Sequence, residues 1–388
     1  MIGKDDVIRI QKELTDLEPP VLSVYADVNP AKPENANRAW ALRVKNSVKA
    51  LELPREVEKR ALEAVELERQ PEARSLAMFV TADGKAAHVV RHALHVDLPV
   101  VDLANGRVDA RWGDPYVTPL AYALDEYERA AVVWLHGGGW RFFEVFLGEI
   151  EEHGSVFSDV APDLWSELQT FDVGKVRAVA ESRTTGNRDW YARRMESAAH
   201  RHAKHLAQLV DRAVTQMGVE RLVLMGHEEA TKTFADLLPR RAREMIVAHV
   251  SDLPTSGASP AHVLEKVQPA LDEAERAAEL ALLERIREQP GVWGLDPTLL
   301  ALGEGRLSVL VAPWELDARV WRADTGLLAG TAETAAALCQ DGDPEEVALR
   351  DVIVDACTAV VTRLEFASGA PAELLRDEMG GLAGLTRW

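Results

Sequence analysis

Short apolar runs alternate with longer amphipathic stretches along this chain, which is the pattern of strands alternating with helices. In the first third, strands are predicted at 21–28, 76–81, 87–94 and 100–103. Helices are predicted there at 5–17, 35–51, 54–69 and 118–127. Asn35 is placed to cap the second helix, because its side chain can accept a hydrogen bond from a first-turn amide. These elements predict an α+β layer closed by the helix at 118–127.

The middle third is organised around one long helix. Apolar strands at 130–135 and 141–147 flank three glycines, which indicates a hairpin because glycine supplies the positive φ angles of a tight turn. Apolar positions at helical spacing then predict a helix at 188–217, about 45 Å long at 1.5 Å per residue. A strand at 222–225, a helix at 229–238 and a strand at 245–250 follow.

The last third begins with an Ala- and Glu-rich helix from Pro260 to about 288, which suits a linker between domains. Later helices are predicted at 298–303 (with Asp296 as N-cap), 345–358 and 372–379, and strands at 307–312, 320–322, 360–366 and 382–388. A chain of 388 residues exceeds what one core usually holds. The prediction is therefore an α/β and α+β protein with three domains, at 1–127, 128–276 and 277–388.

The formal net charge of −19 repels nucleic acid in general, so any RNA contact must come from local basic patches. One patch starts in the polar loop at 182–187 and continues into the long helix: Arg183, Arg188, Arg193, Arg194, Arg201 and Lys204. The other lies on the helix predicted at 35–51: Arg38, Arg43, Lys45 and Lys49, of which the first and the last two share a helical face. The alternative is an ordinary solvated helix face.

Three other motifs are weaker candidates for a catalytic or metal site. His136-Gly137-Gly138-Gly139 matches the oxyanion motif of some esterases, but the chain has no G-x-S-x-G nucleophile elbow, which favours a hairpin turn. His200 and His202 lie about 200° apart on a helix, so they cannot join His205 around one metal ion. Gly226-His227-Glu228-Glu229 follows a predicted strand, where acid/base groups could lie, but both glutamates also suit a first helical turn.

The two cysteines, Cys339 and Cys357, fit buried thiols in a reducing compartment and cannot form a disulfide framework. The sequence contains no P-loop and no convincing G-x-G-x-x-G, so no cofactor and no metal is expected. The N-terminus is charged where a signal peptide is apolar, and no apolar run approaches 18 residues. A cytoplasmic protein without a membrane or DNA partner is predicted.

Five segments, in a fixed order, resemble the eukaryotic and archaeal class-1 release factors and their relative Pelota. They are VLSVYADVNP with RAWALRVKNSVKAL, AAVVWLHGGGWRFFEVFLGEIEE, YARRMESAAHRHAKHLAQLVDRAVTQMGVERLVLMG, GVWGLDPTLLALGEGRLSVLVAPW and EMGGLAGLTRW. The chain is similar to the divergent bacterial form of this superfamily. The resemblance implies a middle domain with an RNase H-like sheet and a long helix. It also implies a C-terminal α/β/α sandwich like that of kink-turn-binding ribosomal proteins.

The loop before the long helix departs from this family. In release factors it carries Gly-Gly-Gln, which positions water at the peptidyl-tRNA ester. Here its tip reads Thr184, Thr185, Gly186 and Asn187. The catalytic candidate is Asn187, one methylene shorter than glutamine, or a nearby polar group. The stop-codon motif is also absent, since Lys45-Asn46-Ser47 is not a convincing substitute.

The resemblance therefore implies a ribosome-binding factor that does not terminate translation. Pelota also lacks Gly-Gly-Gln and occupies an empty A site, and Balon-like bacterial relatives occupy idle ribosomes in hibernation. The implied partners are ribosomal RNA, with tRNA and a GTPase such as elongation factor Tu as further candidates. Two alternatives stay open: a peptidyl-tRNA hydrolase acting in ribosome rescue, and a protein-interaction module unrelated to ribosomes.

Overall fold

The computed structural model describes residues 20–69, 71–83, 86–98, 107–136, 139–154, 188–251 and 257–388. At 82–83, 86–88 and 188–199 only the backbone is described. The helix predicted at 5–17, the strand at 100–103 and the loop at 182–187 lie outside these residues. The described chain forms several sheets with helices between them, so the predicted mixed α/β class is confirmed.

The chain divides into two compact units. Among the described residues, one unit is Glu128–Ala274, and the other combines 20–127 with Glu275–Trp388. The first unit is therefore an insertion in the second, and we call it the inserted unit. The division into domains 1–127, 128–276 and 277–388 stays a prediction.

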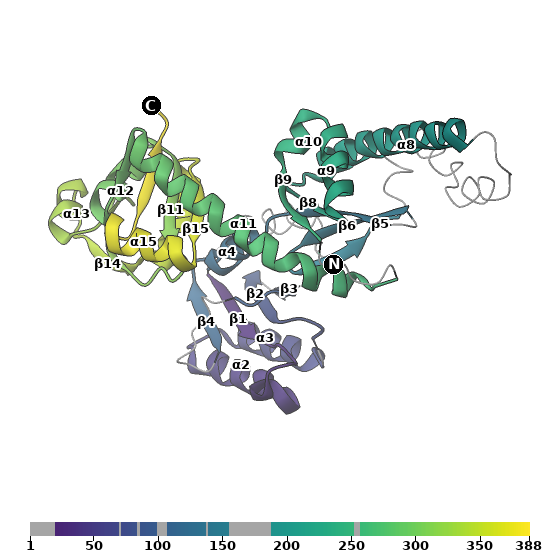
Figure 1. Cartoon of the computed structure of the whole chain (residues 1–388). Helices are drawn as coiled ribbons and strands as arrows, with labels where there is room; N and C mark the ends of the chain where they lie inside the picture. Colours follow the sequence, from purple (N-terminus) through teal and green to yellow (C-terminus); the bar gives the residue numbers. More distant parts are fainter. Residues whose placement is uncertain are drawn as a thin grey trace. The chain divides into compact units, whose positions relative to one another are not determined.

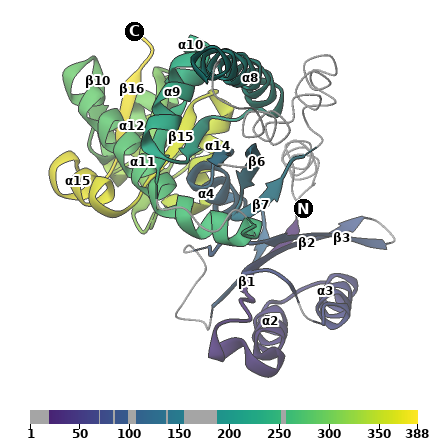
Figure 2. The same ribbon diagram turned by 45° about the vertical axis from the view of Figure 1, so that its right-hand side comes forward.

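An antiparallel sheet in the order β3-β2-β1-β4 forms the N-terminal part of the second unit. Its strands are β1 (Val21–Asp27), β2 (Ser75–Asp83), β3 (Ala86–Leu94) and β4 (Val108–Gly113). Helices α2 (Ala39–Ala50) and α3 (Arg55–Leu67) lie on one face of it (Figure 2). Alternate residues of β1, Leu22, Val24 and Ala26, enter the shared core with these helices, as the period of two along a strand requires.

The helix predicted at 35–51 starts later than expected. A 3₁₀ segment, η1 (Pro33–Arg38), precedes α2, and Asn37 and Arg38 have left-handed φ angles of 54° and 60°. Asn35 is buried and caps no helix: its amide donates to Asp27 Oδ1 at 2.9 Å and to the Asn29 carbonyl at 2.9 Å. Arg38 therefore stands outside the regular helix that carries Lys45 and Lys49.

The inserted unit contains a five-stranded sheet in the order β7-β6-β5-β8-β9 (Figure 1). The strands are β5 (Ala130–His136), β6 (Gly139–Phe146), β7 (Glu149–Glu152), β8 (Arg221–Met225) and β9 (Ile246–Val250). Strands β5, β6 and β7 pair antiparallel, while β8 pairs parallel with β5 and β9 pairs parallel with β8. This 3-2-1-4-5 order is that of the predicted RNase H-like sheet.

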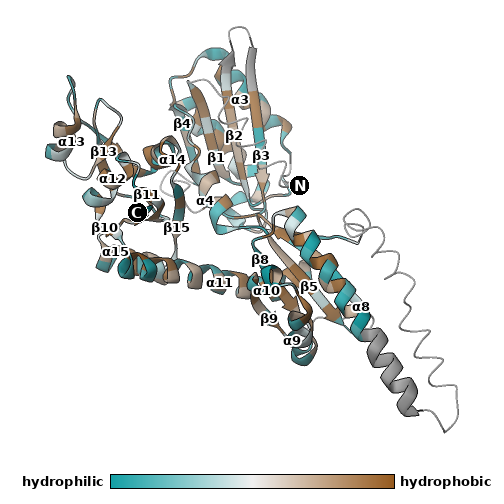
Figure 3. Ribbon diagram, turned by 90° about the horizontal axis from the view of Figure 1, so that it is seen from above, coloured by the Kyte–Doolittle hydropathy of each residue, from teal (hydrophilic) through white to brown (hydrophobic). Residues whose placement is uncertain are grey.

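Helices cover both faces of this sheet, as continuous apolar strands require. One face packs on α8 (Arg188–Met217), α9 (Glu228–Leu237) and α10 (Arg240–Glu244). The other face packs on the first part of α11 (Pro260–Glu288) through Val263, Val267 and Leu271. In Figure 3 the strand β5 is coloured mostly as hydrophobic, in keeping with its burial on both sides.

The C-terminal part of the second unit has a four-stranded sheet in the order β10-β16-β11-β15. These strands are β10 (Gly291–Trp293), β16 (Ala383–Thr386), β11 (Leu307–Pro313) and β15 (Arg363–Ala367). One face packs on α12 (Leu295–Gly303) and α14 (Leu349–Ala359), and the other on α15 (Gly369–Met379) and the end of α11. A second, smaller sheet has the order β13-β12-β14, with strands β12 (Arg319–Arg322), β13 (Leu328–Ala329) and β14 (Glu345–Ala348). Helix α13 (Ala332–Leu338) lies between β13 and β14 in the chain. The layering is the predicted α/β/α sandwich.

Two local predictions for this part were wrong. The helix expected at 345–358 starts at Leu349, because Glu345 to Ala348 form strand β14 against β12. Asp296 is not an N-cap but lies inside α12, where its carboxylate accepts from Gly330 N at 2.7 Å and Thr334 Oγ1 at 3.0 Å.

Helix α4 (Thr118–Glu126) was predicted to close the N-terminal layer, but it packs against α14 and β15. Tyr122 lies in the C-terminal core, with its ring 5.6 Å from that of Phe366 in an edge-to-face arrangement. Asp125 Oδ2 accepts from Phe366 N at 2.7 Å, and Thr118 Oγ1 donates to the Arg350 carbonyl at 2.6 Å. The helix thus belongs to the C-terminal sandwich.

Candidate functional site

The long helix α8 carries the first basic patch. Its buried stripe starts at Leu206 and continues through Val210 and Val214, at the spacing of one helical face. These residues pack on Leu222 and Leu224 of the sheet. The second half of α8 is therefore anchored in the core of the inserted unit, which fixes the direction of the whole helix.

Arg201 and Lys204 are exposed and lie three residues apart, so they share one face of α8 just before its buried stripe. Arg188, Arg193 and Arg194 belong to the earlier turns of the same helix, where the backbone alone is described. Arg183 and the loop tip Thr184, Thr185, Gly186 and Asn187 lie outside the described residues. The described part of the patch thus consists of two exposed cations on a helix with a fixed base.

The three histidines of α8 do not form a metal site. His200 is exposed, while His202 and His205 are half-buried. Burial, with a contribution from His205, lowers the pKa of His202, which keeps the ring neutral at ordinary pH. Among the residues that the structure describes, no three His, Cys, Asp or Glu side chains are placed to hold a metal ion.

The second patch is engaged within the protein. The Arg38 guanidinium donates to the carbonyls of Val65 at 2.9 Å and Glu68 at 2.8 Å, at the end of α3. Arg43 donates to the Glu34 carbonyl at 2.8 Å and to the side chain of Asn35. These two arginines hold η1, α2 and α3 together, so a phosphate would have to compete with existing hydrogen bonds.

Lys45 is also paired, whereas Lys49 is exposed without a described partner. Lys45 Nζ forms an ion pair with Glu66 on α3, and Arg38 lies 3.9 Å from the same carboxylate. The hydrogen bond from Lys45 lowers the pKa of Glu66, which stays ionised. Of the four predicted cations of this patch, only Lys49 is exposed and not held by a neighbouring element.

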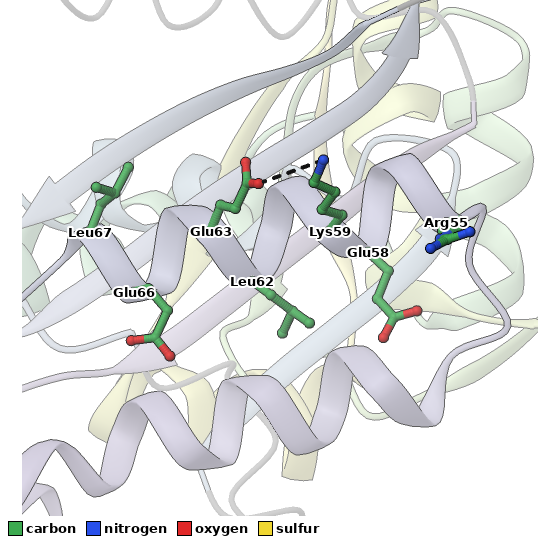
Figure 4. Close-up of a pocket in the computed structure, with 7 residues that line it drawn as sticks. All are labelled: Arg55, Glu58, Lys59, Leu62, Glu63, Glu66 and Leu67. Carbon is green, nitrogen blue, oxygen red and sulfur yellow. Dashed lines mark ion pairs between the residues drawn. The ribbon is translucent and has the colours of Figure 1, made fainter.

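A shallow hollow lies on α3 beside this patch (Figure 4). Its lining residues all belong to that one helix: Arg55, Glu58, Lys59, Leu62, Glu63, Glu66 and Leu67. Lys59 and Glu63 form an ion pair of 4.0 Å across one turn. A surface of alternating charges around Leu62 offers no set of like-charged groups for a small ligand, and it is unsuited to a polyanion.

Strands β5 and β6 pair antiparallel with His136 opposite Gly139, as a hairpin requires, while Gly137 and Gly138 lie outside the described residues. Arg141, the third residue of β6, is largely buried. Its guanidinium lies over the ring of Phe143 at 4.8 Å, donates to the Ala258 carbonyl at 2.8 Å and holds Glu152 at 2.7 Å. The described part of the segment is thus a packed hairpin.

Gly226-His227-Glu228-Glu229 is also structural. His227 is the N-cap residue of α9, and both glutamates lie in its first turn, as the helix dipole favours. Glu228 is exposed and pairs with Lys232 at 2.6 Å. A Cβ at Gly226 would stand 2.8 Å from the Leu135 carbonyl oxygen, so the glycine is required by the close approach of β5.

Two further findings concern a buried thiol and membrane-spanning helices. Burial raises the pKa of the Cys357 thiol to about 12, which keeps it protonated and unreactive. No helix among the described residues is long and apolar enough to cross a membrane.

The family of bacterial archaeo-eukaryotic release factors numbered 10 matches residues 115–272. This range holds α4, the inserted unit with α8, and the first part of α11. No curated protein sequence matches the chain.

Solved structures similar to the chain include Pelota from Archaeoglobus fulgidus, 13% identical, covering 100% of this chain and 94% of the other with a TM-score of 0.32. Dom34 from S. cerevisiae is 11% identical over 81% and 80% of the two chains, with a TM-score of 0.38. A ribosome-bound archaeal Pelota with ABCE1 is 13% identical over 100% and 95%, with a TM-score of 0.42. At these TM-scores the superpositions add no argument to the family match. Over residues 115–272 the chain is thus similar to the bacterial archaeo-eukaryotic release factors of family 10, in agreement with the resemblance seen in the sequence.

Proposed function

We propose that this protein binds the ribosome and occupies its A site in hibernation or rescue, without stop-codon-dependent peptide release. The observation that carries the proposal is the family match over residues 115–272, joined to a loop that lacks Gly-Gly-Gln. A factor with this middle region and no glutamine at the loop tip retains a means of entering the ribosome. It lacks the group that release factors use to position water.

The RNA contact is assigned to α8 and the loop before it. Arg201 and Lys204 are exposed on a helix whose other half is packed in a core, and Arg188, Arg193 and Arg194 precede them in the sequence. Phosphate contacts of this kind position a protein on RNA without reading its sequence. Arg38, Arg43 and Lys45 already have partners within the protein, so the N-terminal patch contributes less to RNA binding, through Lys49.

Ribosome pelleting across a salt series tests this assignment. Arg201→Glu with Lys204→Glu should weaken binding and flatten the slope of log affinity against log salt by a little under about two units, close to one per lost phosphate contact. Arg212→Glu is the matched control: this exposed arginine lies on the same helix, about 16 Å further along at 1.5 Å per residue. Equal pelleting of the double variant and the wild type would remove the face of α8 that carries Arg201 and Lys204 from the interface. A wild type that does not pellet would favour a non-ribosomal interaction module.

Peptide release from loaded ribosomes separates occupancy from hydrolysis. The proposal expects no release by the wild type, because Asn187 is shorter than glutamine and no second glycine stands beside it. If the wild type releases peptide and Asn187→Ala does not, the protein is a peptidyl-tRNA hydrolase acting in rescue. The cytoplasm as its location, tRNA as a further contact and elongation factor Tu as a companion GTPase belong to this same proposal.

A further inference from the structure

The two ends of the inserted unit are joined by an ion pair that lies outside that unit. The chain leaves the second unit after Tyr127 and re-enters it at Glu275. Glu126, one residue before the exit, and Arg276, one residue after the re-entry, lie 2.7 Å apart between Oε2 and Nη2. Residues 150 positions apart in the sequence thus meet at the neck of the insertion.

A second carboxylate completes this contact. Arg276 Nη2 is also 2.8 Å from Glu279 Oε1, and Glu279 Oε2 accepts from Ser368 N at 3.1 Å. Glu279 is fully buried, and Glu126 is 12% exposed. Glu275, 2% exposed, adds a third carboxyl group on the same helix. The carboxylates of Glu126 and Glu279 therefore share one guanidinium nitrogen, and Glu275 adds negative charge beside them.

One arginine cannot neutralise both the Glu126 and the Glu279 carboxylate at this largely buried place, so one of the two carboxyls is expected to keep its proton. Burial raises the pKa of Glu279 to about 8; Ser368 and Arg276 oppose the shift, and Glu126 and Glu275 add to it. Tyr122, Asp125 and Tyr127 at the end of α4 are further titratable groups in this region, and Asp125 accepts from Phe366 N on β15. The phenol of Tyr122, whose pKa burial raises, stays neutral.

We propose that Glu126, Arg276 and Glu279 form a proton-dependent clasp that holds together the two ends of the inserted unit where they join the rest of the protein. With Glu279 protonated, Arg276 balances Glu126 and the clasp is closed. When Glu279 gives its proton to solvent, the buried cluster gains a negative charge that Arg276 cannot offset. The clasp then opens more often, and the backbone hydrogen bonds of α4 and of α11 from Glu275 onward open together.

The direction of the pH effect follows from proton binding. The closed clasp holds one proton more than the open one between the ordinary pKa of glutamate, 4.5, and the raised value of about 8. Closure therefore weakens as pH rises through this window, by up to about tenfold in the opening equilibrium per pH unit, and levels off above it.

Hydrogen exchange of the full chain between pH 6 and pH 9, corrected for intrinsic exchange, tests the clasp. In the wild type, opening of α4 and of α11 from Glu275 onward should rise with pH and level off near pH 8. Glu279→Gln keeps an acceptor for Ser368 N but cannot ionise, so its opening should be independent of pH in this window. Glu315→Gln is the matched control, because Glu315 pairs with Arg376 at 2.6 Å in the same unit. It should retain the slope of the wild type.

A slope unchanged in Glu279→Gln would overturn the proposal, as would a wild type without a slope. Glu126→Gln gives a second reading, since it removes one charge of the cluster and should move the midpoint to lower pH. An unmoved midpoint would show that Glu126 and Glu279 do not share this site. These outcomes do not depend on ribosome binding, so they stand apart from the proposed function.

Discussion

Val361 holds a conformation that its side chain disfavours. Its φ is 54°, in the left-handed region, and its side chain is 83% exposed. The residue ends α14 in a Schellman arrangement: Val361 N donates to the Thr358 carbonyl at 3.2 Å and Thr362 N to the Cys357 carbonyl at 2.9 Å. Glycine is the usual residue here, because a β-branched side chain crowds the backbone at positive φ.

Val361→Gly should therefore stabilise the C-terminal part, by about 0.5 to 1 kcal/mol, since the relief of strain exceeds the added entropy of the unfolded chain. Native-state hydrogen exchange of α14 measures the change. Val247→Gly is the control: this exposed valine lies in strand β9, where glycine should destabilise by a similar amount. Destabilisation in both variants would contradict the reading of Val361 as strained.

Single residues also mark the limit of sequence reasoning about the site. Charge spacing identified Arg38, Arg43 and Lys45 as a patch, but it could not show that each of them already has a partner. Those partners come from η1 and α3, which the spacing does not report. The cluster of Glu126, Arg276 and Glu279 was missed for the same reason, since 150 residues separate its two arms and neither arm has a local motif.

At the level of elements, α4 packs in the core of the C-terminal sandwich, which is distant from it in the sequence. Tyr122 is 6% exposed and packs among residues of α12, β11 and α14. Tyr122→Ala should cost about 3 kcal/mol, because it leaves a cavity in that core. The loss should appear as faster hydrogen exchange in α14 and β15, with β1 and β2 unchanged.

Tyr122→Phe is the control for this prediction, because it keeps the ring that meets Phe366. It should stay within about 1.5 kcal/mol of the wild type, as shape-conserving core changes do. If Tyr122→Ala instead loosened β1 and β2, α4 would belong to the N-terminal layer that the sequence predicted.

The hydrophobic pattern correctly predicted the helices and strands whose apolar residues are buried in a core. The stripe of α8 and the apolar runs of β5 and β8 are clear in the sequence and correct in the structure. Strand β14 was not predicted, because Glu345 and Glu346 interrupt the alternation of apolar and polar residues that indicates a strand. It is held by cross-strand pairs, Glu345 with Arg322 at 2.7 Å and Glu346 with Arg319 at 3.4 Å. Pairing across strands is long-range information that a local pattern does not carry.

At the scale of the whole molecule, net charge and local charge act in opposite directions. The chain carries −19, while the candidate contact surface on α8 is basic. Long-range repulsion from RNA and short-range attraction by α8 are screened over different distances. The Debye length is about 30 Å at 0.01 M salt and about 10 Å at 0.1 M. The proposed ribosome contact therefore has a distinctive dependence on ionic strength.

The association rate with ribosomes should pass through a maximum as salt is raised. At the lowest salt the whole molecule repels ribosomal RNA and encounter is slow; near 0.1 M that repulsion is screened while a patch within about 10 Å still attracts. Stopped-flow fluorescence of labelled protein measures the rate. Arg201→Glu with Lys204→Glu should lower the maximum, because two cations of the patch become acids while Arg188, Arg193 and Arg194 remain. A wild-type rate that falls steadily from the lowest salt would mean that the net charge does not govern the approach and that the basic surface is larger than α8 supplies.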